Sequence, residues 1–306
     1  MTANKTDLIT PPLFILSAPR SFTSLLCAMV GQHPQMYGVP ELNLFAAETI
    51  QQLLSRFSGL EQFQLHGLLR TVAQIYTQEQ SIDTIEMAYR WIMQRYTHTT
   101  AEVYRELCAQ VYPLKIVDKS PCYSTQSATL DRIESAFPDA HYLYIVRHPR
   151  AQGRSMMNVA DGMMTILGRS IDYSVSPPCS DPQFLWADIQ RTILNFLDRI
   201  PEHRQKRLRG EEVLGDTEGR FQEIYEWLGL RWDEEAYQSV LRPDQSVYAC
   251  PGPYGAQLGN DPNFLKSPIF KTRPIASEPL EGALSWREDN RGFIPDVLEI
   301  ARSLGY

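Results

Sequence analysis

Two segments of the sequence combine arginine with hydroxyl side chains at spacings that suit the binding of phosphate groups. The first, residues 17–24 (SAPRSFTS), lies between the apolar runs 13–16 and 25–30. A turn from a strand into a helix presents free backbone N–H groups and the positive end of the helix dipole, which together bind phosphate. The segment lacks the glycines and the lysine of the GxxxxGK[ST] loop, which disfavours a magnesium-dependent kinase. The alternative interpretation is that its hydroxyl groups only cap the helix.

The second segment pairs Arg147 with Ser155, eight residues further on. Arg147 follows the apolar run 142–146, which predicts a strand, and Pro149 suits the first turn of a following helix. Open α/β sheets bind ligands at the carboxyl ends of their strands. An arginine and a hydroxyl at one such corner can hold a second phosphate. The alternative is an ordinary cluster of surface arginines.

These segments must be positioned by alternating strands and helices, which predict a parallel sheet. Short apolar runs predict strands at 13–16, 114–118 and 142–146, and helical patterns follow them. We also expect a helical insertion at about 46–112 and an irregular region, rich in proline and glycine, at about 242–282. Long irregular regions of this kind often form lids or binding loops. Further helices are predicted at 130–137, 183–200, 218–229 and 293–304.

Composition narrows the classes of function. The 306 residues carry 36 Asp and Glu against 29 Lys and Arg, a formal net charge of −7. A nucleic-acid binder is usually basic, so we expect none here. No apolar run approaches the length of a spanning helix and residues 1–12 lack a secretion signal, which predicts a cytoplasmic protein without membrane association. The five cysteines and six histidines form no ligand motif, so no metal site is expected.

In their order along the chain, the motifs resemble those of the sulfotransferases, which use 3′-phosphoadenosine 5′-phosphosulfate (PAPS) and release PAP. Besides the two segments above, the matching stretches are 117–121 (VDKSP), 137–140 (FPDA), and 286–287 with 304–306. In addition, 209–214 resembles a strand of the family and 221–230 resembles the helix that follows it. The resemblance implies a P-loop-like three-layer sandwich with a central parallel sheet. It also implies a single domain of residues 13–306, with 1–12 as a linker or flexible N-terminus.

The resemblance further implies which residues hold the nucleotide. The first loop would grip the 5′-phosphosulfate through Arg20, Ser21, Phe22, Thr23 and Ser24, and Arg147 with Ser155 would grip the 3′-phosphate. A basic residue near 271–273 closes over the nucleotide in related enzymes, which makes Lys271 and Arg273 candidates, with a solvated loop as the alternative. The chain has Arg20 where many members have Lys, Phe22 where many have Gly and Gly210 where many have Tyr. The motifs therefore do not identify the residues that contact adenine.

Sulfuryl transfer moves a neutral SO₃ unit, so fixed cations and backbone dipoles can serve where phosphoryl transfer recruits Mg²⁺. We assign Arg20 to the bridging oxygen and the departing phosphate. By resemblance, Lys119 would neutralise charge near the sulfuryl oxygens. The main alternative for residues 116–118 is a Walker-B-like strand in which Asp118 binds magnesium.

The acceptor hydroxyl needs a base within hydrogen-bond reach. Glu41, in 39–42 (VPEL), resembles the catalytic carboxylate of several sulfotransferase branches in its location. The alternative is that Glu41 caps the next helix. His33, His66 and His98 are reserve candidates, each better interpreted as structural.

One further charged segment is the basic run 203–209 (HRQKRLR). We interpret it as the solvated end of a helix, with a docking site for an acidic protein as the alternative.

The resemblance is nearest to the sulfotransferase domains of modular polyketide synthases of the curacin and cyanobacterial olefin synthase types. It implies an acceptor that is the β-hydroxyl of an acyl chain on the phosphopantetheine arm of an acyl carrier protein. A downstream thioesterase would couple sulfate loss to decarboxylation, giving a terminal alkene, and 242–282 would be a lid that admits the arm. The alternatives are a free-standing sulfotransferase of a small metabolite or carbohydrate, and a non-catalytic nucleotide-binding module or P-loop kinase.

Overall fold

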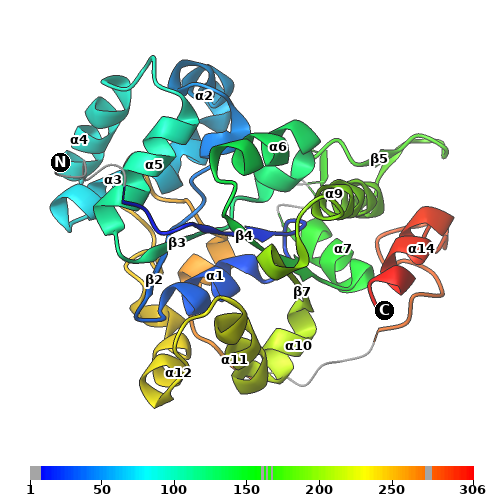
Figure 1. Cartoon of the computed structure of the whole chain (residues 1–306). Helices are drawn as coiled ribbons and strands as arrows, with labels where there is room; N and C mark the ends of the chain where they lie inside the picture. The colour runs from blue at the N-terminus through cyan, green and yellow to red at the C-terminus, as the bar shows by residue number, and fades with distance from the viewer. Residues whose placement is uncertain (1–7, 160–161, 163–164, 167, 273–277) are drawn as a thin grey trace.

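The computed structural model describes the chain except for residues 1–7, 160–161, 163–164, 167 and 273–277 (Figure 1). Five short strands form one sheet in the order β2-β3-β1-β4-β7, and every neighbouring pair is parallel. The strands are β1 (Leu13–Leu16), β2 (Met36–Gly38), β3 (Lys115–Asp118), β4 (His141–Val146) and β7 (Gln205–Arg209). The predicted parallel sheet is confirmed. A separate antiparallel pair consists of β5 (Ile171–Asp172) and β6 (Cys179–Ser180).

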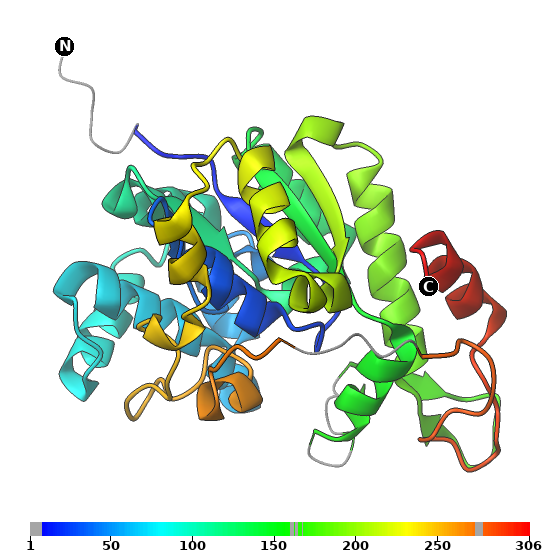
Figure 2. The ribbon, with the colours of Figure 1, turned by 90° about the horizontal axis from the view of Figure 1, so that it is seen from below.

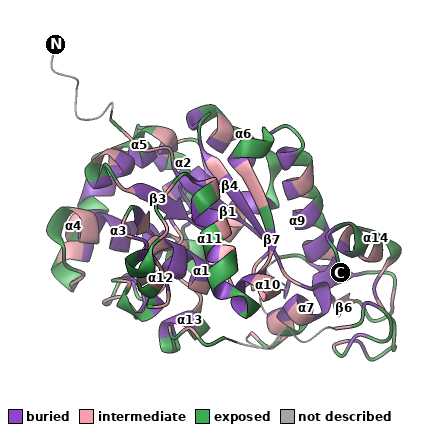
Figure 3. Cartoon of the chain, turned by 60° about the horizontal axis from the view of Figure 1, so that its bottom comes forward, coloured by how far each residue is buried: buried purple, intermediate pink, exposed green. Residues whose placement is uncertain are grey.

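Alternate side chains of each strand point to opposite faces of the sheet, and each face is covered by helices. Leu13 and Ile15 of β1 pack in one apolar cluster with α1 (Thr23–Gly31) and α11 (Thr217–Trp227). Phe14 and Leu16 pack on the other face, with α5 (Thr100–Val111), α6 (Ser127–Ala136) and α9 (Pro182–Leu197). Figures 2 and 3 show these helices on both sides of a buried sheet. The three-layer sandwich predicted by the resemblance is therefore present.

The helical insertion is also confirmed. It contains the short helix α2 (Ile50–Arg56) and the longer helices α3 (His66–Thr77), α4 (Ile82–Met93) and α5. The 3₁₀ segments η2 (Leu44–Ala46) and η3 (Gly59–Leu65) lie at their start and between them. Thr49, Ser81 and Thr99 begin α2, α4 and α5 with capping boxes, in which a hydroxyl and the side chain three residues later satisfy each other's backbone N–H groups. The sequence therefore contains the start signals of these helices.

Further helices complete the layers. Among the described residues they are α7 (Pro149–Met157), α10 (Gly210–Gly215), α12 (Glu234–Val240), α13 (Pro262–Lys266) and α14 (Pro295–Ser303), with the 3₁₀ segments η4 (Pro121–Thr125), η6 (Glu202–Arg204) and η7 (Pro243–Gln245). The helices predicted at 130–137, 183–200, 218–229 and 293–304 correspond to α6, α9, α11 and α14. In the described part of the chain, no helix is both long enough and apolar enough to cross a bilayer.

Two predictions near the edge strand β7 are wrong. The basic run 203–209 is not the solvated end of a helix, because 205–209 pairs with β4 from Gln205 opposite Tyr142 to Arg209 opposite Val146. Along β7, Leu208 is buried, Lys206 and Arg209 are partly exposed and Arg207 is exposed. The stretch 209–214 resembles a strand motif, but only Arg209 belongs to the strand and 210–215 forms α10. The strand β2 was not predicted.

The region 242–282 is mostly irregular, as predicted, with η7 and α13 as its helical segments among the described residues. Phe264 and Leu265 of α13 pack with Ala28 of α1. Figure 2 shows α13, in orange, beside the blue helix α1. The irregular region is thereby placed next to the loop that follows β1.

Candidate active site

The loop between β1 and α1 has an uncommon backbone conformation. Arg20 and Phe22 have φ values of 66° and 65°. These lie in the left-handed backbone region, which residues other than glycine rarely adopt. The N–H of Leu26 donates to the carbonyl of Phe22 (3.0 Å). The backbone N–H groups before Leu26 belong to the first turn of α1, where no helical carbonyl is available to accept from them. Free amides and the positive end of the α1 dipole therefore meet at this loop, which is the arrangement that binds anions.

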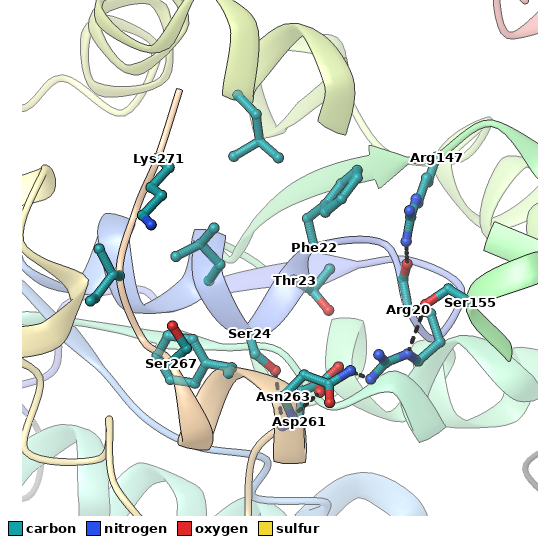
Figure 4. A pocket seen from close by; sticks show the side chains of 14 residues that line it. Arg20, Phe22, Thr23, Ser24, Arg147, Ser155, Asp261, Asn263, Ser267 and Lys271 are labelled. Atoms are coloured by element: carbon teal, nitrogen blue, oxygen red, sulfur yellow. Dashed lines mark hydrogen bonds and ion pairs between the residues drawn. The ribbon is translucent and has the colours of Figure 1, made fainter. Parts of the chain in front are cut away.

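A cavity of about 350 Å³ lies beside this loop (Figure 4), within the range of small-molecule sites. Four separated parts of the chain line it: the loop after β1, the corner between β4 and α7, Leu214 of α10, and the region 242–282. The first, second and fourth of these parts carry its charged side chains. Of the predicted nucleotide-binding residues, those that line it are Arg20, Phe22, Thr23, Ser24, Arg147, Ser155 and Lys271. Ser21 is buried and does not line it, and Arg273 lies outside the described residues.

Arg20 connects the three parts of the cavity wall that carry charged side chains. Its Nε donates to the Oγ of Ser155 (3.2 Å), and its Nη1 forms an ion pair with Asp261. The N–H of Asp261 in turn donates to the Oγ of Ser24 (3.2 Å). Burial lowers the pKa of Arg20, and the nearby carboxylate of Glu41 opposes that shift. The carboxylate of Asp261 thus lies beside Arg20, where an anionic ligand would bind.

Sequence reasoning missed Asp261. Its side chain caps α13 by accepting from the N–H of Asn263 (2.8 Å), and Pro262 is the first residue of that helix. An aspartate followed by a proline is a helix-start signal, so the helix could have been predicted. The pairing with Arg20 could not, because 241 positions separate the two residues.

Arg147 directly follows β4 and is held without a salt bridge in the part of the chain that the structure describes. Its guanidinium lies over the ring of Phe22, with Cζ 4.1 Å from the ring centroid, and its Nη1 donates to the carbonyl of Arg20 (2.6 Å). Burial lowers the pKa of Arg147 to about 10, while Glu211 raises it, so the side chain stays charged at neutral pH.

The Nε of Arg147 and the Oγ of Ser21 are both buried without a hydrogen-bond partner among the described residues. An unsatisfied buried polar atom is costly, and the Nε of Arg147 is the kind of donor that a phosphate oxygen satisfies. The residues present therefore fit a ligand with an anionic group at each of two places.

Glu41 and Lys119 form an ion pair in which the Lys119 side chain is 2% exposed and that of Glu41 24%. The N–H of Glu41 donates to the carbonyl of Gly259 (2.7 Å). Glu41 caps no helix, because the next helical segment, η2, begins after Asn43. The pair does not line the cavity. The structure thus brings Arg20 and Arg147 together as predicted, but holds Lys119 against Glu41.

Asp118 faces the protein core. It is fully buried and accepts hydrogen bonds from the Oγ of Ser120 (2.8 Å) and the Oη of Tyr123 (2.9 Å). Burial raises the pKa of Asp118 to about 7, against these hydrogen bonds. Ser120 also accepts from the N–H of Asn43 (3.0 Å), which ties the turn after β3 to the segment that carries Glu41. The geometry therefore gives Asp118 a role in fixing this turn and no access to a metal in the cavity.

The reserve histidines do not line the cavity. His33 is held by the carbonyl of Arg231 and by the N–H of Gln35, and His66 accepts from the N–H of Leu258 (3.2 Å). His98 is exposed. Over the described ranges, no three His, Cys, Asp or Glu side chains gather as a metal site would require.

The fold and the cavity together define a P-loop-like α/β protein with two arginines, Arg20 and Arg147, in a cavity at the carboxyl ends of its strands. Residues 11–234 match the sulfotransferase family, which is more than half of the chain. The chain therefore belongs to the sulfotransferase family and is a sulfotransferase. No curated protein matches the sequence.

Two solved structures resemble the whole chain. The sulfotransferase domain from the curacin biosynthetic pathway is 25% identical, with a TM-score of 0.75 over 98% of this chain and 99% of that one. The sulfotransferase domain from the olefin synthase of Synechococcus PCC 7002 is 24% identical, with a TM-score of 0.75 over 100% of this chain and 99% of that one. The latter likeness concerns the fold alone.

Proposed function

We propose that this sulfotransferase takes the sulfuryl group of PAPS, transfers it to a hydroxyl acceptor and releases PAP. The observation that carries the proposal is that two arginines, Arg20 at the N-terminus of α1 and Arg147 at the end of β4, line one cavity. In this proposal Arg20 and the N-terminus of α1 would bind one anionic group, and Arg147 with Ser155 would bind the other. A nucleotide with anionic groups on both its 5′ and 3′ positions matches this pair, whereas a nucleotide with a single phosphorylated position would leave one site unused.

The chemistry assigned to the residues is a direct displacement. The acceptor oxygen forms a bond to sulfur as the bond between sulfur and the bridging oxygen breaks. Glu41 takes the proton of the acceptor hydroxyl. Arg20 stabilises the negative charge on the departing phosphate, and Lys119 neutralises charge near the sulfuryl oxygens. The ion pair with Lys119 keeps Glu41 beside that cation, so proton removal and charge neutralisation would occur at one place.

The other predicted contacts serve the nucleotide. Ser21, Thr23 and Ser24 belong to the loop that would grip the phosphosulfate, and Lys271 extends into the cavity from the opposite wall (Figure 4). We propose that the region 242–282 closes over the nucleotide with Lys271 and Arg273, since Asp261 of this region already contacts Arg20.

For the acceptor, we propose the β-hydroxyl of an acyl chain carried on the phosphopantetheine arm of an acyl carrier protein. A thioesterase would then couple loss of the sulfate to decarboxylation and release a terminal alkene. Support comes from the likeness to the curacin-pathway domain over nearly the full length of both chains.

The proposal is tested by intact-mass analysis after incubation with PAPS and a panel of acceptors, in buffer that contains EDTA. We expect a carrier protein bearing a β-hydroxyacyl group to gain the mass of one SO₃ unit, and free small alcohols to react poorly. The same carrier protein with an acyl chain that lacks the hydroxyl is the matched control. Preferential reaction of a free metabolite or carbohydrate would contradict the acceptor, and a requirement for Mg²⁺ would contradict the reaction.

The Asp261→Asn variant should bind PAP about 1.5- to 5-fold more tightly than the wild type. The substitution removes a negative charge that competes with the nucleotide for Arg20, and asparagine preserves the cap of α13. The factor corresponds to the energy typical of a partly exposed ion pair. Calorimetric titration with PAP at two salt concentrations measures it, with the exposed pair of Arg242 and Asp244 altered by Asp244→Asn as control. Weaker binding by the Asp261 variant would show that Asp261 orients Arg20 instead of competing for it.

A further inference from the structure

Phe22 and Gly210 lie far apart in the sequence, and the structure places them in contact. A Cβ added to Gly210 would lie 2.8 Å from the Cδ2 of Phe22, too close for two carbon atoms. Gly210 is the first residue of α10. Glycine costs more backbone entropy there than alanine would. The close contact of position 210 with the Phe22 ring gives a physical reason for the glycine.

The other neighbour of the Phe22 ring is the guanidinium of Arg147, whose Cζ lies 4.1 Å from the ring centroid. An arginine side chain has several rotatable bonds, and holding it in one place costs entropy. A carboxylate could hold it but would neutralise the charge that a phosphate needs. The ring of Phe22 and the carbonyl of Arg20 hold Arg147 and leave its full positive charge.

We propose that Phe22 is a positioning residue for the 3′-phosphate site, and that Gly210 is required because it leaves room for the Phe22 ring. The inference rests on the proposed use of PAPS. Phe22 acts through Arg147 in this proposal. Its backbone remains part of the loop at the N-terminus of α1, and its ring sets where the guanidinium lies.

The first test measures the binding of PAP and of adenosine 5′-phosphate, which lacks the 3′-phosphate, by calorimetry. The Phe22→Gly variant removes the ring and tolerates the φ of 65° at this position. We expect it to bind PAP about 3- to 30-fold more weakly, the range for a cation–π contact that is partly or fully desolvated, and adenosine 5′-phosphate as the wild type does. The conservative variant Phe22→Tyr should restore the affinity for PAP.

The second test is a double-mutant cycle on the same readout. Gly210→Ala alone should weaken PAP binding, because its Cβ displaces the ring. In the Phe22→Gly background the same substitution should cost no PAP affinity, and the unfolding temperature should be unchanged or higher since alanine favours a helix. An equal loss of affinity in both backgrounds would overturn the assigned contact between Gly210 and Phe22.

Two results separate failure of this inference from failure of the proposed function. A wild-type protein that binds PAP no better than adenosine 5′-phosphate would contradict the use of PAPS itself. A wild type that prefers PAP, with a Phe22→Gly variant of undiminished preference, would overturn only the role of Phe22.

Discussion

The Glu41→Gln variant should lower kcat by about 10²–10⁴, the usual contribution of a positioned general base, while the affinity for PAP stays nearly unchanged. Glutamine retains an oxygen that can accept from the Nζ of Lys119 but cannot take the proton of the acceptor hydroxyl. Glu41 does not line the cavity that holds Arg20 and Arg147, so nucleotide binding should be insensitive to the change. Steady-state turnover and calorimetric titration with PAP measure the two quantities separately.

Folding must be checked in the same experiment, because the substitution leaves the buried ammonium of Lys119 without its counter-charge. Removing one member of a buried ion pair costs stability, and we expect a lower unfolding temperature for the variant. The control is Glu61→Gln, which alters an exposed carboxylate in η3 and should change neither turnover nor stability. Full turnover by a folded Glu41→Gln variant would refute the assignment of Glu41 as base.

The Arg147→Met variant should bind PAP about 10²- to 10⁴-fold more weakly and adenosine 5′-phosphate as well as the wild type does. Methionine fills much of the same space beside Phe22 but removes the charge and the N–H donors. Each hydrogen bond to a charged group contributes about 1.5–3 kcal/mol, and an arginine can offer a phosphate two of them. The ratio of the two affinities, measured by calorimetry, reports the 3′-phosphate site by itself.

The matched control for this prediction is Arg154→Met, on the same helix as Ser155. Arg154 is paired with Glu278 at the surface, with its side chain 45% exposed, and exposed pairs contribute little. We expect a small change for both ligands. Equal weakening of PAP and adenosine 5′-phosphate by Arg147→Met would mean that Arg147 contacts a part of the nucleotide other than its 3′-phosphate.

Local patterns were sufficient to predict the elements that carry the site. The apolar runs before Arg20 and Arg147 are strands of one parallel sheet, and the predicted helices that follow them are α1 and α7. Each of these signals depends on neighbours within a few residues. Strands without such a signal were missed or misassigned. The strand β2 is three residues long, and β7 is an edge strand with a basic sequence whose regularity comes from pairing with β4.

The sequence by itself determined the class of fold, the loop and the corner that line the cavity, and the membership of residues 11–234 in the sulfotransferase family. Only the tertiary structure decided which charges meet. The pairing of Arg20 with Asp261, of Lys119 with Glu41, and the stacking of Arg147 on Phe22 join residues that are between 78 and 241 positions apart. Such contacts depend on how the layers pack, and no local spacing encodes them. The sequence thus supplied the cations, and the packing decided that Arg147 has no salt-bridge partner among the described residues.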